Sequence, residues 1–205
     1  MTKGRRRAVR PALLVVISGP AGVGKDALIR RLKERGYPFH FVVTATDRAP
    51  RPGEEQGKDY FFLTAGQFDT LIERDELLEH AVVYNQRKGI PKQQIRDALA
   101  TGKDVILRID VQGAATVRRL LPDALLIFLS AGSIHELEER LRQRGTDSPS
   151  QIEMRIATAH REMSQLSRFD YVVINNEGQL DRAADHVMSI LRLEHSRKTP
   201  RVVEL

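Results

Sequence analysis

The stretch Gly19-Pro-Ala-Gly-Val-Gly-Lys25-Asp26 decides the fold of this chain. It satisfies the spacing GxxxxGK, follows the apolar run 13–17 and precedes a helical pattern over residues 27–35. A strand, a glycine-rich turn and a helix in this order are typical of a phosphate-binding loop, because the glycines let the backbone wrap closely around oxygens. Its N–H groups and the helix N-terminus carry partial positive charge, and the lysine reaches the outer phosphates. The predicted ligand is therefore a polyphosphate.

One position departs from the common form of this motif. Asp26 stands where a phosphate loop usually has a Ser or Thr whose hydroxyl binds magnesium. A carboxylate also binds Mg²⁺, directly or through water, but it brings a negative charge close to the phosphates. The hypothesis is that Asp26 is a metal ligand and that Mg²⁺ lies between it and the phosphates.

Outward from the loop, apolar runs alternate with helical patterns. The runs are continuously hydrophobic, which is typical of parallel strands buried on both faces, and they cover residues 13–17, 39–43, 105–109, 124–129 and 171–174. Amphipathic helical patterns separate most of them, over residues 27–35, 113–121, 134–144 and 180–193. This alternation predicts an α/β fold with a doubly wound parallel sheet as its core.

Residues 44–102 have a different sequence pattern from the predicted core, with turn-forming residues and short elements in place of long apolar runs. They hold the turn Pro50-Arg-Pro-Gly53, a strand-like stretch at 60–63, and helical patterns near 66–74 and 91–100. The segment is interpreted as an inserted α+β lobe that binds a substrate. Capping boxes mark three helix starts, at residues 64–67, 133–136 and 148–151.

Composition narrows the function classes. The 205 residues include no cysteine, which excludes disulfides, thiolate zinc sites and cysteine nucleophiles and favours a cytoplasmic location, with organellar targeting as the alternative. The longest apolar run, 12–17, is too short to span a membrane. Five of the basic residues lie within residues 1–10, which have no acid, so the net charge of +6 falls to +1 over residues 11–205. Residues 1–10 are interpreted as a disordered basic tail without a specific nucleic-acid partner, a tail that binds nucleic acid being the alternative.

Further motifs point to a known family. A turn rich in arginine and proline, Thr44-Ala-Thr-Asp-Arg48-Ala-Pro-Arg51-Pro-Gly53-Glu54, precedes Gly57-Lys-Asp-Tyr60. Together with the phosphate loop, these stretches resemble guanylate kinase, and the resemblance spans about residues 13–193. Its other motifs are Glu79, Ile109-Asp110-Val-Gln112-Gly113, Glu139-Arg140-Leu141, Arg144-Gly145-Thr146, Arg155 and Phe169-Asp170-Tyr171. The segment 88–94 and the Gly24-Lys25-Asp26 variant look most like the branch of plant organellar and some bacterial guanylate kinases.

The resemblance implies a P-loop kinase that transfers the γ-phosphoryl group of MgATP to GMP, giving ADP and GDP, as a monomer or homodimer. It implies a core of residues 11–43, 103–133 and 158–205, a GMP-binding lobe of residues 44–102 and a helical lid of residues 134–157. The residues it implies for ATP are Gly19, Pro20, Ala21, Gly22, Val23, Gly24, Lys25, Asp26, Arg140 and Arg144. Lys25, Arg144 and Arg155 are the implied catalytic residues, which neutralise charge on the transferring group.

The resemblance also implies a site for GMP. Its residues are Thr44, Arg48, Arg51, Tyr60, Glu79, Lys88, Asp110 and Arg155. Arg48 and Arg51 would clamp the phosphate, since guanidinium groups fit phosphate oxygens bidentately, with the Tyr60 hydroxyl as a further donor. A carboxylate at Glu79 accepts from guanine N1–H and the 2-amino group, whereas adenine has no 2-amino donor and a bare N1 acceptor.

Two positions differ from the family pattern. Most members have two tyrosines before Gly89, the second binding the GMP phosphate, where this chain has Arg87 and Lys88. Phosphate binding then either passes to the Lys88 ammonium, or Lys88 points away from the site. Arg108 stands where many members carry an acid.

Two alternatives remain at this stage. One is a non-catalytic guanylate-kinase-like module that binds phosphopeptides, against which the complete phosphate loop argues. The other is a kinase for another phosphorylated acceptor such as a sugar phosphate, which Lys88 would favour and Glu79 opposes.

Overall fold

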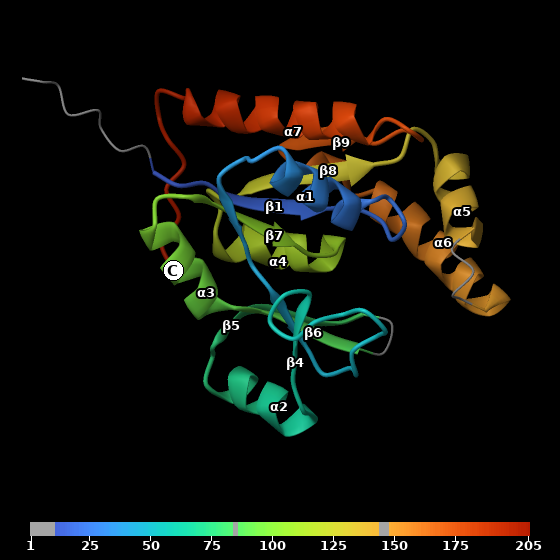
Figure 1. The fold of residues 1–205 in the computed structure, drawn as a ribbon, viewed down its shortest axis with the longest axis horizontal. Helices are drawn as coiled ribbons and strands as arrows, with labels where there is room; N and C mark the ends of the chain where they lie inside the picture. Colours follow the sequence, from blue (N-terminus) through green and yellow to red (C-terminus); the bar gives the residue numbers. More distant parts are fainter. Residues whose placement is uncertain (1–10, 84–85, 144–147) are drawn as a thin grey trace, which may run out of the picture.

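The strand before the phosphate loop lies at the centre of a five-stranded parallel sheet (Figure 1). This is seen in a computed structural model that describes residues 11–83, 86–143 and 148–205. The strand order is β2-β7-β1-β8-β9. The strands are β1 Leu14–Ser18, β2 Phe39–Phe41, β7 Asp104–Arg108, β8 Leu125–Ser130 and β9 Tyr171–Ile174. Because the order reverses around β1, the carboxyl ends of the central strands form the crevice where open α/β sheets bind ligands.

Helices cover both faces of this sheet, so the central strands β1, β7 and β8 are buried on both sides, whereas the edge strands β2 and β9 are partly exposed. The helices are α1 (Lys25–Glu34) and α7 (Leu180–His195) on one face, and α3 (Lys92–Ala100) and α4 (Val111–Leu120) on the other (Figure 1). Alternate side chains of β1 enter two separate cores: Val15 and Ile17 pack toward α1 and α7, whereas Leu14 and Val16 pack toward α3 and α4. This two-sided burial explains the continuous apolar runs and confirms the doubly wound α/β prediction.

A smaller mixed sheet forms the inserted lobe below the core in Figure 1. Its order is β4-β3-β6-β5, with β3 parallel to β4 and antiparallel to β6. The elements are β3 Thr44–Thr46, β4 Tyr60–Phe62, α2 Ala65–Glu73, β5 Leu77–Val83 and β6 Gln86–Pro91. The predicted capping box at the start of α2 is confirmed, since the Gln67 N–H donates to Thr64 Oγ1 (3.2 Å) and Gln67 Oε1 accepts from the Thr64 N–H (2.8 Å).

Two helices, α5 (Ile134–Gln143) and α6 (Pro149–Met163), stand at the edge of the core on the right of Figure 1. The box predicted at residues 148–151 begins α6, because the Gln151 N–H donates to Ser148 Oγ and Gln151 Oε1 accepts from the Ser148 N–H. α6 continues unbroken past residue 157, the expected end of the lid, and is followed by a short 3₁₀ turn, Leu166–Arg168. Between residues 11 and 205, leaving out 84–85 and 144–147, no helix has the length and apolarity to cross a membrane.

The predicted strand 39–43 is shorter than expected. β2 ends at Phe41, the fully buried Val42 forms the crossing, and β3 begins at Thr44 in the other sheet. The apolar run 39–43 therefore spans the passage from the partly exposed edge strand β2 to the buried strand β3 in the other sheet. β6 was not predicted: it contains polar residues, Gly89 and Pro91, and it forms because β3 and β5 pair with its two edges.

A buried carboxylate at the start of β7 ties the core together. Asp104 is 5% exposed and accepts hydrogen bonds from the Leu13 N–H (2.9 Å) and the Tyr37 hydroxyl (2.8 Å), and it contacts His195 Nε2 at 2.9 Å. Burial, followed by the bond to Asp104, raises the pKa of Tyr37. One side chain thus joins β1, the α1–β2 connection and the end of α7.

We expect Asp104→Ala to lower the free energy of unfolding by about 2–4 kcal/mol, because the Tyr37 hydroxyl and the Leu13 N–H lose their buried acceptor. Urea unfolding followed by circular dichroism measures the change. The exposed Asp123→Ala is the matched control, with a change of about 0.5 kcal/mol or less. Equal stability of the two variants would contradict the structural role of Asp104.

Candidate active site

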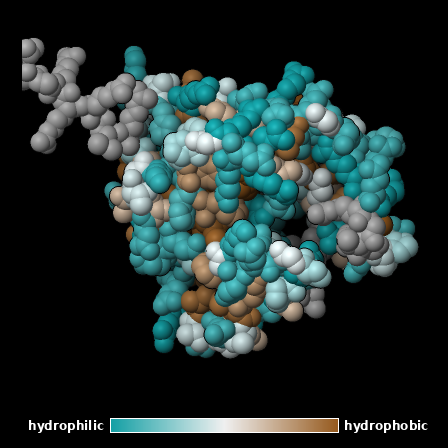
Figure 2. Space-filling view, in the orientation of Figure 1, coloured by the Kyte–Doolittle hydropathy of each residue, from teal (hydrophilic) through white to brown (hydrophobic). Residues whose placement is uncertain are grey.

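A cleft of about 1220 Å³ lies between the core, the inserted lobe and α6. In Figure 2 the surface is hollowed between these parts, and its rim is mostly hydrophilic. The cleft brings together predicted residues from both halves of the site: Gly19, Pro20, Ala21, Gly22, Gly24, Lys25, Asp26, Thr44, Arg48, Arg51, Tyr60, Glu79, Lys88, Asp110, Arg140 and Arg155. Val23 is fully buried beneath the loop. The predicted Arg144 lies outside the described residues.

The phosphate loop contains two glycines at which a side chain would be strained. Gly19 has φ of +139°, and a Cβ there would lie 2.1 Å from the Leu129 carbonyl oxygen. Gly24 has φ of +97° and is the N-cap of α1, and a Cβ there would lie 2.6 Å from Asn175 Nδ2. The loop therefore lies directly against β8 and the end of β9, and the N-terminus of α1 opens into the cleft.

Asn175 supports the loop from behind, a role that the sequence analysis missed. Its buried side-chain amide donates to the Val23 carbonyl oxygen (2.9 Å). The Arg140 guanidinium donates to the Asn175 carbonyl oxygen (2.8 Å), and Arg140 also pairs with Glu136 and with Glu177 (3.1 Å). The available signal was position: Asn175 directly follows a predicted strand, where sites in α/β sheets gather.

Lys25 lies under the loop, and its ammonium donates to the carbonyl oxygens of Gly19 (2.5 Å) and Pro20 (2.9 Å). Burial lowers the pKa of Lys25 to about 8, although the nearby carboxylates of Glu162, Asp26 and Asp110 act in the opposite direction. The lysine is therefore a half-buried cation held against the loop carbonyls at the floor of the cleft.

Glu162 of α6 was also missed. It lines the cleft, and burial raises the pKa of its carboxyl group to about 7, while the positive charge of Lys25 lowers it. Among the described residues, its Oε2 atom is buried without a hydrogen-bond partner. Only the tertiary structure places this acid beside Lys25, because the two residues lie on helices that are far apart in the sequence and share no motif.

On the lobe side, Arg48 is fixed by a residue whose role was not predicted. Glu54 accepts from both terminal nitrogens of the Arg48 guanidinium, each at 2.6 Å, and the same guanidinium lies 4.8 Å from the Tyr60 ring centroid. Arg48 Nη1 also donates to the Ala49 carbonyl oxygen (2.8 Å). Glu54 and Ala49 thus use three of the five guanidinium hydrogens, and the hydrogens on Nε and Nη2 that they leave lie beside Tyr60. Arg51 is exposed at the same turn, and its N–H donates to Glu54 Oε2 (2.8 Å).

Lys88 points into the cleft and Arg87 points away from it. Lys88 lines the cleft, with Nζ 5.9 Å from the Tyr60 ring centroid. Arg87 pairs with Asp47 (2.5 Å) and Asp69 outside the cleft. Because successive side chains of a strand face opposite sides, β6 separates the two cations. Lys88 therefore faces the cleft, and phosphate binding by its ammonium group stays a prediction.

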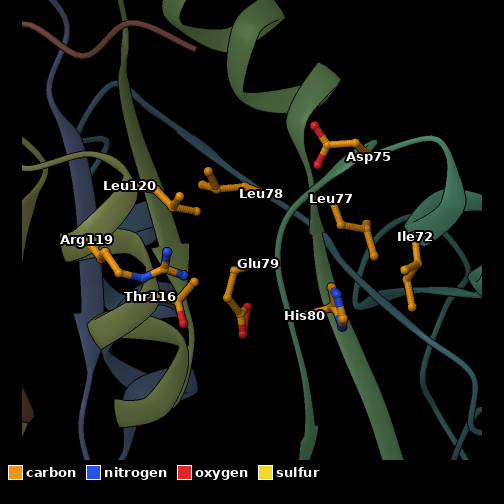
Figure 3. A pocket seen from close by; sticks show the side chains of 9 residues that line it. All are labelled: Ile72, Asp75, Leu77, Leu78, Glu79, His80, Thr116, Arg119 and Leu120. Atoms are coloured by element: carbon orange, nitrogen blue, oxygen red, sulfur yellow. The ribbon is translucent and has the colours of Figure 1, made fainter.

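Glu79 lies between β5 and α4 and is 5% exposed (Figure 3). Behind it is a second cavity of about 320 Å³, which Thr116 and Arg119 of α4 also line. Burial, and then the charge of Asp110, raise the pKa of Glu79 to about 7, whereas Lys88 lowers it. The carboxylate occupies the space of a missing side chain, because a Cβ on Gly113 would lie 2.6 Å from Glu79 Oε1.

Comparisons with known proteins agree with this geometry. A sequence model of the guanylate kinase family matches residues 12–194. "Guanylate kinase 2, chloroplastic/mitochondrial" of Oryza sativa subsp. japonica is 52% identical over 94% of this chain and 68% of the relative. A guanylate kinase of Lactobacillus johnsonii is 42% identical over 93% of both chains. The crystal structure of guanylate kinase from Anaplasma phagocytophilum has a TM-score of 0.76 at 28% identity, covering 92% of this chain and 89% of that one.

The charges of Asp110 and Lys88 should shift the pKa of Glu79 in opposite directions. We expect Asp110→Asn to lower the pKa of Glu79, because a neighbouring negative charge is removed, and Lys88→Gln to raise it, because a positive charge is removed. Asparagine is a good N-cap, so α4 keeps its start in the first variant. Carboxyl-detected NMR titration of the nucleotide-free protein measures both values, and shifts of the same sign would contradict the assignment.

Proposed function

The chain belongs to the guanylate kinase family and transfers the γ-phosphoryl group of ATP to GMP, and we propose that this transfer takes place in the cleft between the phosphate loop and the inserted lobe. The observation that carries the proposal is that one cleft holds both a complete phosphate loop and the buried Glu79. The donor nucleotide would bind at the phosphate loop and the acceptor nucleotide at the lobe, so that their phosphates face each other between Lys25 and Arg48. Positioning and charge neutralisation are the main needs of phosphoryl transfer, and no protein nucleophile is required.

At the donor end, the main-chain N–H groups of residues 19–24 and the Lys25 ammonium would hold the ATP phosphates. Lys25 would exchange its bonds to the neutral loop carbonyls for bonds to charged phosphate oxygens, which are stronger for a half-buried cation. Arg140 supports the loop through Asn175 and faces the cleft, so we assign it to the ATP end. Arg155 of α6 lines the cleft and would neutralise charge between donor and acceptor, with Arg144 as the proposed second cation.

At the acceptor end, the remaining donors of Arg48, the exposed Arg51, the Tyr60 hydroxyl and the Lys88 ammonium would bind the GMP phosphate. Glu79, in its ionised form, would accept from guanine N1–H and the 2-amino group, with Thr44 and Asp110 beside it. Adenine would leave this buried carboxylate facing an acceptor nitrogen, which costs roughly 1–3 kcal/mol or more. This is the proposed source of guanine specificity.

Mg²⁺ is the proposed metal, and Asp26 is its proposed protein ligand. The residues fit, because Mg²⁺ usually takes one or two carboxylates together with substrate phosphates and waters, and Asp26 extends from the start of α1 into the cleft. Within the described part of the chain, no group of three or more His, Cys, Asp or Glu side chains is arranged to hold a metal. When bound, Mg²⁺ would neutralise negative charge on the donor phosphates.

We further propose that closure of the lobe and of α5–α6 excludes water from the cleft. The chain would act as a monomer or a homodimer. For the compartment we propose the cytoplasm, on the absence of cysteine, with an organelle as the alternative that the name of the rice relative supports. Localisation of the tagged full chain separates the two.

The role assignment is tested by two variants that should fail differently. We expect Lys25→Met to lower kcat by roughly 10²–10³-fold, because a phosphate-neutralising cation is lost, and Glu79→Gln to lower kcat/KM for GMP by roughly 100-fold while ATP affinity is retained. Coupled ADP release with GMP and AMP, and calorimetry with ATP, measure these values. Lys33→Met, on the outer side of α1, is the control and should match the parent. Normal GMP turnover by both site variants would overturn the assignment.

Gly113→Ala should separate guanine recognition from folding. We expect it to raise KM for GMP by about tenfold or more, because the new methyl group displaces the Glu79 carboxylate, while alanine stabilises the helix by up to about 1 kcal/mol. Gly66→Ala in α2 is the matched control, since nothing lies within 4 Å of its added Cβ. Steady-state kinetics and thermal unfolding measure both effects, and an unchanged KM for GMP would contradict the proposed position of Glu79.

A further inference from the structure

Two residues that depart from the family pattern form an ion pair with each other. Asp26, near the start of α1, and Arg108, the last residue of β7, are far apart in the sequence. In the structure the Arg108 guanidinium donates to Asp26 Oδ1, at the point where the phosphate loop enters the cleft. In the sequence the two departures stand apart, an acid in place of a hydroxyl at position 26 and a base in place of an acid at position 108. The structure shows that they occur as one unit.

The Arg108 side chain is held in place on more than one side. It is 16% exposed, and its Cζ lies 5.5 Å from the Phe41 ring centroid and 5.3 Å from that of Tyr60. Burial opposes its charge, but Asp26 and other neighbouring groups outweigh this and raise the pKa of Arg108. Asp26 is 63% exposed, so its carboxylate reaches into the cleft while one of its oxygens is bound by a fixed cation.

The charges that surround this pair explain why it is needed. A bare carboxylate at position 26 would repel the phosphates that the adjacent loop binds, and the acids Glu162 and Asp110 already lie near Lys25. A hydroxyl at this position carries no such cost. Arg108 supplies the charge that balances Asp26, and the neighbouring rings of Phe41 and Tyr60 limit how far the guanidinium can turn away.

We propose that Arg108 is a positioning residue that neutralises and orients Asp26, so that the carboxylate can serve beside the donor phosphates in place of the usual hydroxyl. This inference rests on the proposed position of ATP and Mg²⁺ at the phosphate loop. It makes the two positions interdependent: an acid at 26 requires a base at 108, and the need is greatest when no metal is present to offset the carboxylate.

The test is a double-mutant cycle of Asp26→Ser, Arg108→Gln and the double variant. The readout is the dissociation constant of ATP, measured by calorimetry in EDTA and again in excess Mg²⁺. In EDTA we expect Arg108→Gln to weaken binding by about tenfold, Asp26→Ser to tighten it by a few-fold, and the double variant to lie within about threefold of the parent. With Mg²⁺ the loss caused by Arg108→Gln should become smaller.

Three controls give each outcome one meaning. Arg108→Lys keeps the charge and should retain most of the metal-free affinity for ATP. Arg31 lies on α1, like Asp26, but pairs with Asp181 of α7 outside the cleft, so Arg31→Gln should leave the affinity for ATP unchanged. If Arg108→Gln weakens binding by the same factor in the parent and in the Asp26→Ser background, Arg108 acts independently of Asp26 and the inference is wrong. Lys25→Met tests the premise separately: unchanged ATP affinity in that variant would show that the proposed donor position is wrong, whatever the cycle gives.

Discussion

The structure depends on how closely the phosphate loop approaches the sheet. The backbone at Gly19 touches the β8 backbone, and Gly24 contacts the amide of Asn175, so that neither position has room for a side chain. This close contact fixes the start of α1, and with it Lys25 and Asp26, relative to the central strands. The cleft is built around that fixed point: β7 contributes Arg108, and the crossing after β9 contributes Asn175.

Burial and local charge set the protonation of the cleft. Lys25 has its pKa lowered to about 8, and Glu79 and Glu162 have theirs raised to about 7, in each case chiefly through burial. Such shifted values gather at functional sites, because the same desolvation that shifts them also strengthens interactions with a ligand of opposite charge. Burial thus shifts the pKa of a base downward and the pKa values of two acids upward within one cleft.

The acceptor end shows how strand pairing assigns side chains to a site. In β6, pairing on both edges places Lys88 in the cleft and Arg87 against Asp47, although the two residues are chemically similar neighbours. In the turn after β3, Glu54 holds the Arg48 guanidinium in one orientation before any phosphate is bound. Both effects reduce the freedom of long side chains, which lowers the entropic cost of ordering them on a ligand.

Periodicity and spacing in the chain were enough to predict the parallel core, the phosphate loop and the starts of α2 and α6, because these features depend on local backbone chemistry and on burial of continuous apolar runs. The other predicted residues of the cleft came from the family resemblance. The pairing of Asp26 with Arg108, the support of the loop by Asn175 and the placing of Glu162 beside Lys25 emerged only from the folded chain. Each of these joins residues from separate elements. Their contact depends on how the strands are ordered and how α6 packs, and no local pattern encodes that arrangement.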